Sequence, residues 1–257
     1  MKGLIIKDLM SFRKGLINVI FVSAAVLVFS VMVCISAGSG NLYRMMQENT
    51  LKTDEYSFPP MMVLKFIILV LMILPMVSVG DSITYLLRED KRSGFVSVVS
   101  ATPLTIGKRV LARFISLISL YLLGAAASIL ISSLITITSG LIPFSEMLLF
   151  VVGALSVFLI YTFLLFVIDM VLEGSGVFAQ TSAMLLIILG ATIANIGNII
   201  ELIKAGDGFA PVLIDQVNDM FTALPSKAYI FPLIAIIAGL ASYFISVAYA
   251  EKKREVI

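Results

Sequence analysis

The chain has 257 residues, of which 60% are hydrophobic and 13% charged, with a mean hydropathy of +1.10 and a formal net charge of +2. This composition excludes an ordinary soluble domain. The chain has no histidine, which excludes His-ligated metal and haem sites, and its single cysteine, Cys34, excludes an intrachain disulfide.

Six apolar stretches are long enough to cross a membrane, because a helix needs about 20 apolar residues to span a hydrocarbon core of about 30 Å. We therefore predict an all-α polytopic membrane protein, with a single domain over residues 1–257. The chain lacks the Gly-x-x-x-x-Gly-Lys-Ser/Thr motif that holds ATP phosphates, so no nucleotide-binding domain is expected. The six transmembrane helices are expected at about 16–37, 61–85, 114–138, 146–169, 177–200 and 228–250.

Residues 1–14 precede the first span and are predicted to form an amphipathic interfacial helix. Ile5, Leu9 and Phe12 share one helical face, whereas Lys7 lies on the opposite face. Basic residues on the polar face of such a helix favour the anionic lipids of the inner leaflet. The alternative is that this segment is a helical extension of the first span.

Two polar insertions, at 41–60 and 201–227, are predicted to lie on the outer side of the membrane. Residues 212–224, in the middle of the second insertion, alternate apolar and acidic residues at helical spacing. This pattern predicts an external or re-entrant helix before the last span. Lys65, near the outer end of the second span, is expected to extend its ammonium group to water.

The basic residues set the predicted orientation in the membrane. Most of the 18 Lys and Arg residues fall on the side that holds both chain ends and the loop between the second and third spans. Because cytosolic segments carry the excess of Lys and Arg, we predict a multi-pass protein with cytosolic N- and C-termini.

The loop at 88–114 combines this charge with a short apolar face. Phe95, Val96 and Val99 recur at helical spacing inside it, and Thr105 is expected to cap the helix of the third span. The apolar segment is either a helix on the membrane surface or a contact for a cytosolic partner. The basic residues of the loop are Arg88, Lys91, Arg92, Lys108, Arg109 and Arg113.

Two acidic residues near span ends, Asp81 and Asp169, have three open interpretations. In the first interpretation, the two residues form an intramembrane aspartyl dyad. The residues up to Asp81 resemble a Gly-x-Gly-Asp motif in which Ser78 replaces the first glycine. Alternatively, Asp169 forms an ion pair with Arg113 or Arg88. In the third interpretation both carboxylates lie in the headgroup zone.

Small residues in the predicted fifth span mark a second candidate surface. Gly190 and Ala194 form a small-xxx-small pair, and Gly197 lies one heptad after Gly190. This pattern is typical of a seam between two subunits, although helix packing within one subunit also explains it.

Three stretches of the chain resemble the ABC-2 family, the permeases of type-2 ABC exporters. Residues 1–9 resemble the start of such permeases, and residues 89–95 and 101–114 resemble their cytosolic signature before the third span. Residues 242–246 and 249–254 are similar to the last span and basic tail of the family. The connection after the fourth span departs from the family, because Asp169 and Glu173 stand where basic residues are expected.

This resemblance implies a non-catalytic permease subunit that exports a hydrophobic or amphipathic peptide across a bacterial cell membrane. A second permease copy, identical or different, would complete the translocation path, and membrane lipids would surround it. A separate cytosolic ABC ATPase would hold ATP and Mg, so this chain is expected to bind no cofactor and no nucleic acid. The ATPase would dock on a short cytosolic coupling helix, with contacts from Arg88, Asp90, Arg92, Phe95, Val96, Val99 and Pro103.

Two other functions stay open at this point. A stand-alone secondary transporter would carry ionisable groups or broken helices near the membrane midplane. An intramembrane enzyme would use the two aspartates as its catalytic groups.

Overall fold

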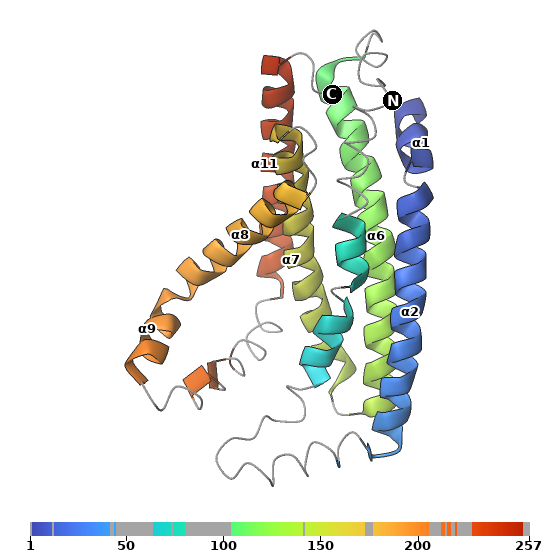
Figure 1. Ribbon diagram of the computed structural model, residues 1–257, viewed down its shortest axis with the longest axis vertical. Helices are drawn as coiled ribbons and strands as arrows, with labels where there is room; N and C mark the ends of the chain where they lie inside the picture. The colour runs from blue at the N-terminus through green and yellow to red at the C-terminus, as the bar shows by residue number, and fades with distance from the viewer. Residues whose placement is uncertain are drawn as a thin grey trace.

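The computed structural model describes residues 2–11, 13–41, 44, 64–72, 74–80, 104–140, 142–172, 177–205, 212–213, 215–216, 219 and 228–253. Within these residues all regular secondary structure is helical (Figure 1). The helices are α1 (Lys2–Ser11), α2 (Arg13–Gly38), α6 (Ile106–Ser139), α7 (Phe144–Val171), α8 (Val177–Ala194), α9 (Ile196–Ala205) and α11 (Ile230–Lys253). A further apolar helix runs over Leu64–Gly80.

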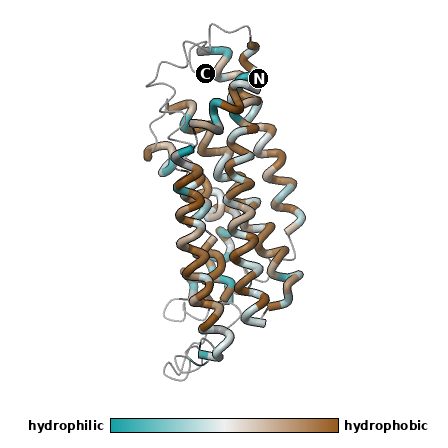
Figure 2. Tube along the Cα trace, turned by 90° about the vertical axis from the view of Figure 1, so that its right-hand side faces the viewer, coloured by the Kyte–Doolittle hydropathy of each residue, from teal (hydrophilic) through white to brown (hydrophobic). Residues whose placement is uncertain are grey.

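Four helices in the described part of the chain are long and apolar enough to cross a membrane. They coincide with the predicted first, third, fourth and sixth spans: Leu16–Ser36, Ile106–Ser139, Phe144–Val171 and Ile230–Lys252. Apolar residues fill the middle of these helices, and polar residues gather toward their ends (Figure 2). These features indicate a helical protein embedded in a membrane.

The α6 helix begins earlier than predicted. It starts at Ile106, whereas the sequence placed the third span from about residue 114, so Lys108, Arg109 and Arg113 belong to a helix rather than to a loop. Hydropathy underestimates such a helix because its first turns carry charges. At the other end, Gly140 adopts φ +62° and its N–H bonds to the carbonyl of Thr136, which closes the helix with a left-handed cap.

The predicted fifth span is not one straight helix. α8 and α9 meet at Asn195 with a bend of 69°. The Asn195 side chain donates a hydrogen bond of 2.8 Å to the carbonyl of Ala191, which also accepts the Asn195 backbone N–H at 3.0 Å. Beyond the break, Gln216 Nε2 donates to the carbonyl of Asn198, so Gln216 contacts α9.

The main core of the bundle forms around the Leu64–Gly80 helix. This helix packs among α2, α6 and α7, and Leu64, Ile68 and Met72 are fully buried there. α11 and α8 pack on α7, whereas α1 lies against α6 and contacts α2. In Figure 1, α1 stands beyond the end of α2 beside the first turns of α6.

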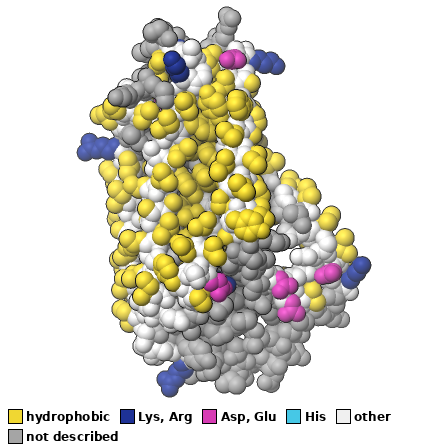
Figure 3. Space-filling model, turned by 180° about the vertical axis from the view of Figure 1, so that it is seen from behind, with side chains coloured by type: hydrophobic (Ala, Val, Ile, Leu, Met, Phe, Trp, Pro, Cys, Tyr) yellow, Lys and Arg dark blue, Asp and Glu magenta, His cyan; other side chains and the backbone are white. Residues whose placement is uncertain are grey.

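The outer faces of the bundle are apolar. In their most apolar windows, α6 and α7 have 50% of their residues buried, against 22% for α2 and 17% for α11. Figure 3 shows hydrophobic side chains over the middle of one face and charged ones toward its ends. The exposed faces of α2 and α11 therefore have the character of surfaces that contact lipid.

One buried hydroxyl links α6 to α7. Tyr121 Oη donates a hydrogen bond of 2.5 Å to the backbone carbonyl of Leu155. We expect Tyr121→Phe to lower the free energy of unfolding by about 1 kcal/mol, because the bond is lost while the ring remains. Equilibrium unfolding in detergent micelles measures this change. Tyr229→Phe, at a side chain that is 69% exposed, is expected to have no effect, and equal losses at both sites would contradict the prediction.

Candidate functional site

The predicted ATPase-coupling residues lie outside the residues that the structure describes. These are Arg88, Asp90, Arg92, Phe95, Val96, Val99 and Pro103, so their roles stay predictions. The described chain reaches Gly80 on one side of this loop and resumes at Leu104 on the other. The described residues that flank this loop therefore define the candidate site, most of which lies at the end of the bundle where α6 begins.

The α6 helix begins directly after the loop, at Ile106. Thr105 occupies the N-cap position in an extended conformation, with φ −64° and ψ 149°, as the sequence predicts. Its side chain makes no capping hydrogen bond, although its carbonyl accepts a bond of 3.2 Å from the Arg109 N–H. Thr105 therefore marks the start of the helix through its backbone rather than through its hydroxyl.

An aromatic cluster lies two turns into α6. The ring of Phe114 stacks on Phe163 with centroids 5.6 Å apart, and it meets Phe166 edge-on at 4.9 Å. Tyr243 of α11 contacts the same ring at 5.9 Å. Aromatic pairs at these separations each add about 0.5–1.5 kcal/mol beyond the burial of their area, so α6, α7 and α11 are firmly joined here.

The described residues on the two sides of the loop belong to one buried apolar cluster but lie at different depths. Val79 packs beside Gly124, 18 residues after the start of α6 at Ile106, whereas Val110 lies in the first turns of α6. Val79, one residue before the described end of the first arm, is fully buried together with Val110 of α6. The same apolar cluster contains Val19 of α2. The space is tight, because a Cβ on Gly124 would lie 2.9 Å from Cγ2 of Val79. A displacement of either arm therefore has to move packed side chains of several helices.

Two tyrosines of α11 also form hydrogen bonds with neighbouring helices at this end. Tyr243 Oη donates to the carbonyl of Gly107 at 3.4 Å, and Tyr249 Oη donates to the carbonyl of Val171 at 3.3 Å. The last helix therefore contacts the start of α6 and the end of α7.

Charged side chains are buried at the same end. The exposed fractions are 1% for Asp8, 8% for Arg109, 9% for Arg113 and 0% for Asp169, and each of the four has an interaction partner. Asp8 Oδ1 lies 3.5 Å from Lys7 Nζ. Burying a charged side chain costs free energy unless it interacts with a partner. The buried acidic and basic side chains at this end each have such a partner.

The predicted ion pair between Asp169 and Arg113 stays a prediction. Both side chains are buried, on the adjacent helices α7 and α6. The complete burial of Asp169 does not fit the interpretation that this carboxylate simply lies among lipid headgroups. Asp81, the other member of the proposed aspartyl dyad, lies outside the described residues.

The opposite end of the bundle holds an ion pair that the sequence analysis did not anticipate. Lys65 Nζ lies 2.5 Å from Glu146 Oε1, and the Lys65 side chain is 2% exposed. The expectation that Lys65 extends to water was therefore wrong, because a carboxylate on the first turn of α7 binds the ammonium inside the bundle. One feature of the sequence is compatible with this ion pair: Lys65 and Glu146 have opposite charges, and both lie near predicted outer ends of spans.

The predicted dimer seam is divided by the bend at Asn195. Gly190 lies on α8 and Gly197 on α9, so the two glycines do not share one straight helical face, and Ala194 is the last residue of α8. A Cβ added at Gly190 or at Gly197 would meet no atom within 4 Å. Packing around these glycines within the described part of the chain is therefore absent, and the dimer seam stays a prediction.

No group of three or more His, Cys, Asp or Glu side chains suited to a metal ion occurs in the part of the chain that the structure describes. Searches among protein-family models, curated proteins and solved structures give no match to this chain.

Proposed function

We propose that this chain is the transmembrane permease subunit of an ATP-driven exporter of the ABC-2 type. The proposal combines six spans, a second permease copy and a separate cytosolic ATPase in a bacterial cell membrane. The exported substrate would be a hydrophobic or amphipathic peptide. The observation that supports it best is that Val79, before the 88–114 loop, belongs to the same buried apolar cluster as Val110 and Phe114 of α6.

A coupling loop has to transmit force rather than absorb it. The first arm follows the Leu64–Gly80 helix, whose side chains fill the main core, and the second arm opens into α6. In the proposed mechanism, closure of the ATPase moves the apolar face at Phe95 and displaces these two helices together. Since packed cores change between discrete arrangements, such a displacement would switch the bundle from one packing to another.

ATP hydrolysis on the partner chain would supply the energy for transport. This sequence has no P-loop, so ATP and Mg would bind to the ATPase, and the permease itself would catalyse no reaction. The second permease copy would pack on the exposed apolar faces of the bundle. α8 is one candidate, because its attachment to α7 rests on Leu165, Ala179 and Ala183.

The sharpest test is Phe95→Asp, a change of the predicted apolar contact. We expect it to abolish co-purification of the ATPase, because a buried carboxylate without a partner costs several kcal/mol. Membrane insertion should remain, and affinity purification followed by identification of the bound chains measures the result.

Ser97→Asp is the matched control, since it adds the same charge two residues away on the opposite side of a helix. It should retain the ATPase. Retention of the ATPase and of transport by Phe95→Asp would show that the coupling assignment is wrong.

A stand-alone secondary transporter is the second candidate, and the bend of 69° at Asn195 is the observation that favours it, because broken helices often form ion and substrate sites. The described ionisable side chains of the bundle, however, gather toward the ends of the helices. Transport in proteoliposomes separates the two functions. Transport driven by an ion gradient without any ATPase would support the carrier.

A further inference from the structure

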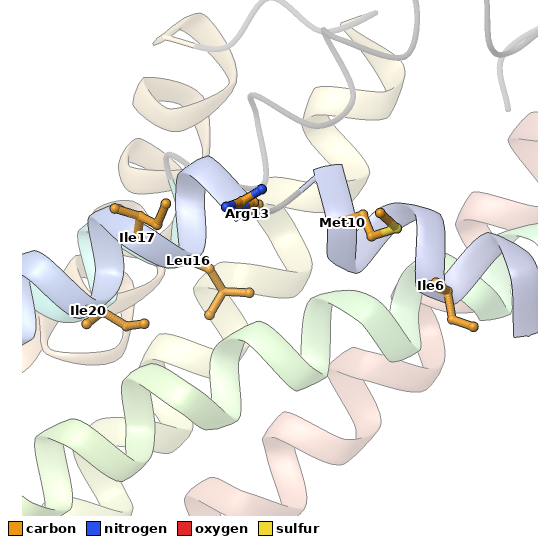
Figure 4. A pocket seen from close by; sticks show the side chains of 6 residues that line it. All are labelled: Ile6, Met10, Arg13, Leu16, Ile17 and Ile20. Carbon is orange, nitrogen blue, oxygen red and sulfur yellow. The ribbon is translucent and has the colours of Figure 1, made fainter.

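A shallow groove of about 380 Å³ lies where α1 and α2 meet. Figure 4 shows its lining, with Arg13 at the junction between the two helices and apolar side chains on both sides of it. The lining residues are Ile6, Met10, Arg13, Leu16, Ile17 and Ile20. One cation within an apolar surface is a pattern that suits an amphiphile with a negative group.

The apolar lining of this groove is uncovered. The exposed fractions are 57% for Ile6, 72% for Met10, 58% for Ile17 and 54% for Ile20. Ile17 and Ile20 belong to the apolar span of α2, whose exposed face has the character of a lipid-contacting surface. Ile6 and Met10 continue this apolar surface onto α1. The groove therefore has the hydrophobic half of a site for an amphiphile.

Arg13 supplies the charged half. Its side chain is exposed, and none of the ion pairs or hydrogen bonds found among the described residues involves it. Lys7, the nearby cation of α1, lies 3.5 Å from a carboxylate oxygen of Asp8 and forms an ion pair with it. Arg13 is thus available to an external anion, and guanidinium groups bind phosphate through paired hydrogen bonds.

The position of Arg13 along the helix matches the depth of lipid phosphates. The apolar span of α2 begins at Leu16, three residues later, which is a rise of about 4.5 Å along the axis. The polar zone of a bilayer is about 5–7 Å thick on each side of the hydrocarbon core. Arg13 therefore lies within that zone, while Ile17 and Ile20 face the upper acyl chains.

We propose that this groove binds an anionic phospholipid. Arg13 would hold the phosphate, and an acyl chain would lie along Ile17 and Ile20. A free phosphate ion would leave the apolar lining uncovered, and a zwitterionic lipid would bring a second cation close to Arg13. The proposal needs only that the protein is embedded in a membrane, so it is independent of the ATPase partner.

Lipid titration of the purified, delipidated protein tests the proposal, with native mass spectrometry as the readout. Phosphatidylglycerol should bind about fivefold more tightly than phosphatidylcholine, which is the expected effect of one basic residue at an anionic surface. Arg13→Gln should reduce this preference to near unity, whereas Arg13→Lys should retain most of it. Ile17→Ala should weaken the binding of both lipids.

Lys204→Gln is the matched control, because it removes an exposed cation from α9, away from the groove. It should leave the preference unchanged. An equal loss in Lys204→Gln and Arg13→Gln would overturn the proposal, as would a preference that survives in Arg13→Gln. Loss of the preference on addition of inorganic phosphate would show an anion site rather than a lipid site, and would also overturn it.

Discussion

Replacement of Glu146 by glutamine is expected to lower the free energy of unfolding by about 3 kcal/mol, the lower end of the range for breaking a buried ion pair. The change leaves the ammonium of Lys65 without its carboxylate, in a residue that is 1% exposed. The Glu146 side chain is 31% exposed, so water compensates part of the loss. Equilibrium unfolding in mixed micelles, followed by circular dichroism, measures the effect.

A double variant separates the ion pair from other effects of the substitution. Lys65→Met combined with Glu146→Gln removes both charges, so its stability should return to within about 1 kcal/mol of the original protein. Glu201→Gln, at an exposed position of α9, is the control and should change stability by less than about 0.5 kcal/mol. Equal losses in Glu146→Gln and Glu201→Gln would contradict a stabilising pair.

The second large effect is expected at Gly239, where α11 packs closely against Phe163 of α7. A Cβ at Gly239 would lie 2.7 Å from Cε2 of Phe163, within the ring of a residue that belongs to the aromatic cluster. Gly239→Val should therefore lower the free energy of unfolding by about 3 kcal/mol, through overpacking that forces the two helices apart. The same micelle unfolding experiment detects it.

Gly190→Val provides the matched control for this steric argument. It makes the same substitution on α8, where an added Cβ meets no atom within 4 Å. It should be neutral or slightly stabilising, because valine has a better helix propensity than glycine. Phe163→Leu in the Gly239→Val background should recover part of the loss. If both glycine variants lose the same stability, steric contact with Phe163 is not the cause.

Hydropathy predicts the long helices of this protein well, because their apolar composition is a local property of the sequence. The spans at 16–37, 114–138, 146–169 and 228–250 all coincide with long helices. The start of α6 was placed too late for the same reason: hydropathy stops at the basic residues, although nothing prevents Lys108 and Arg113 from continuing a helix.

Features that depend on tertiary contacts are harder to predict from the sequence. The pairing of Lys65 with Glu146 joins residues far apart in the chain, and the position of each alone suggests only a residue near the membrane surface. The bend at Asn195 interrupts an apolar stretch, and an average of hydropathy over that stretch does not register it. The aromatic cluster brings together Phe114, Phe163 and Tyr243 from three different helices, and no local pattern in the sequence indicates that they are in contact.

The length of α6 has a consequence for where its charged first turns lie. With 34 residues the helix is about 51 Å long, and a tilt of about 20° leaves about 48 Å along the bilayer normal. A bilayer with its headgroups measures about 40–45 Å. Because the charged turns lie at the Ile106 end, the overhang is on that side. α6 is thus longer than the hydrocarbon core requires, and its charged first turns, with Lys108 and Arg109, extend beyond the acyl chains.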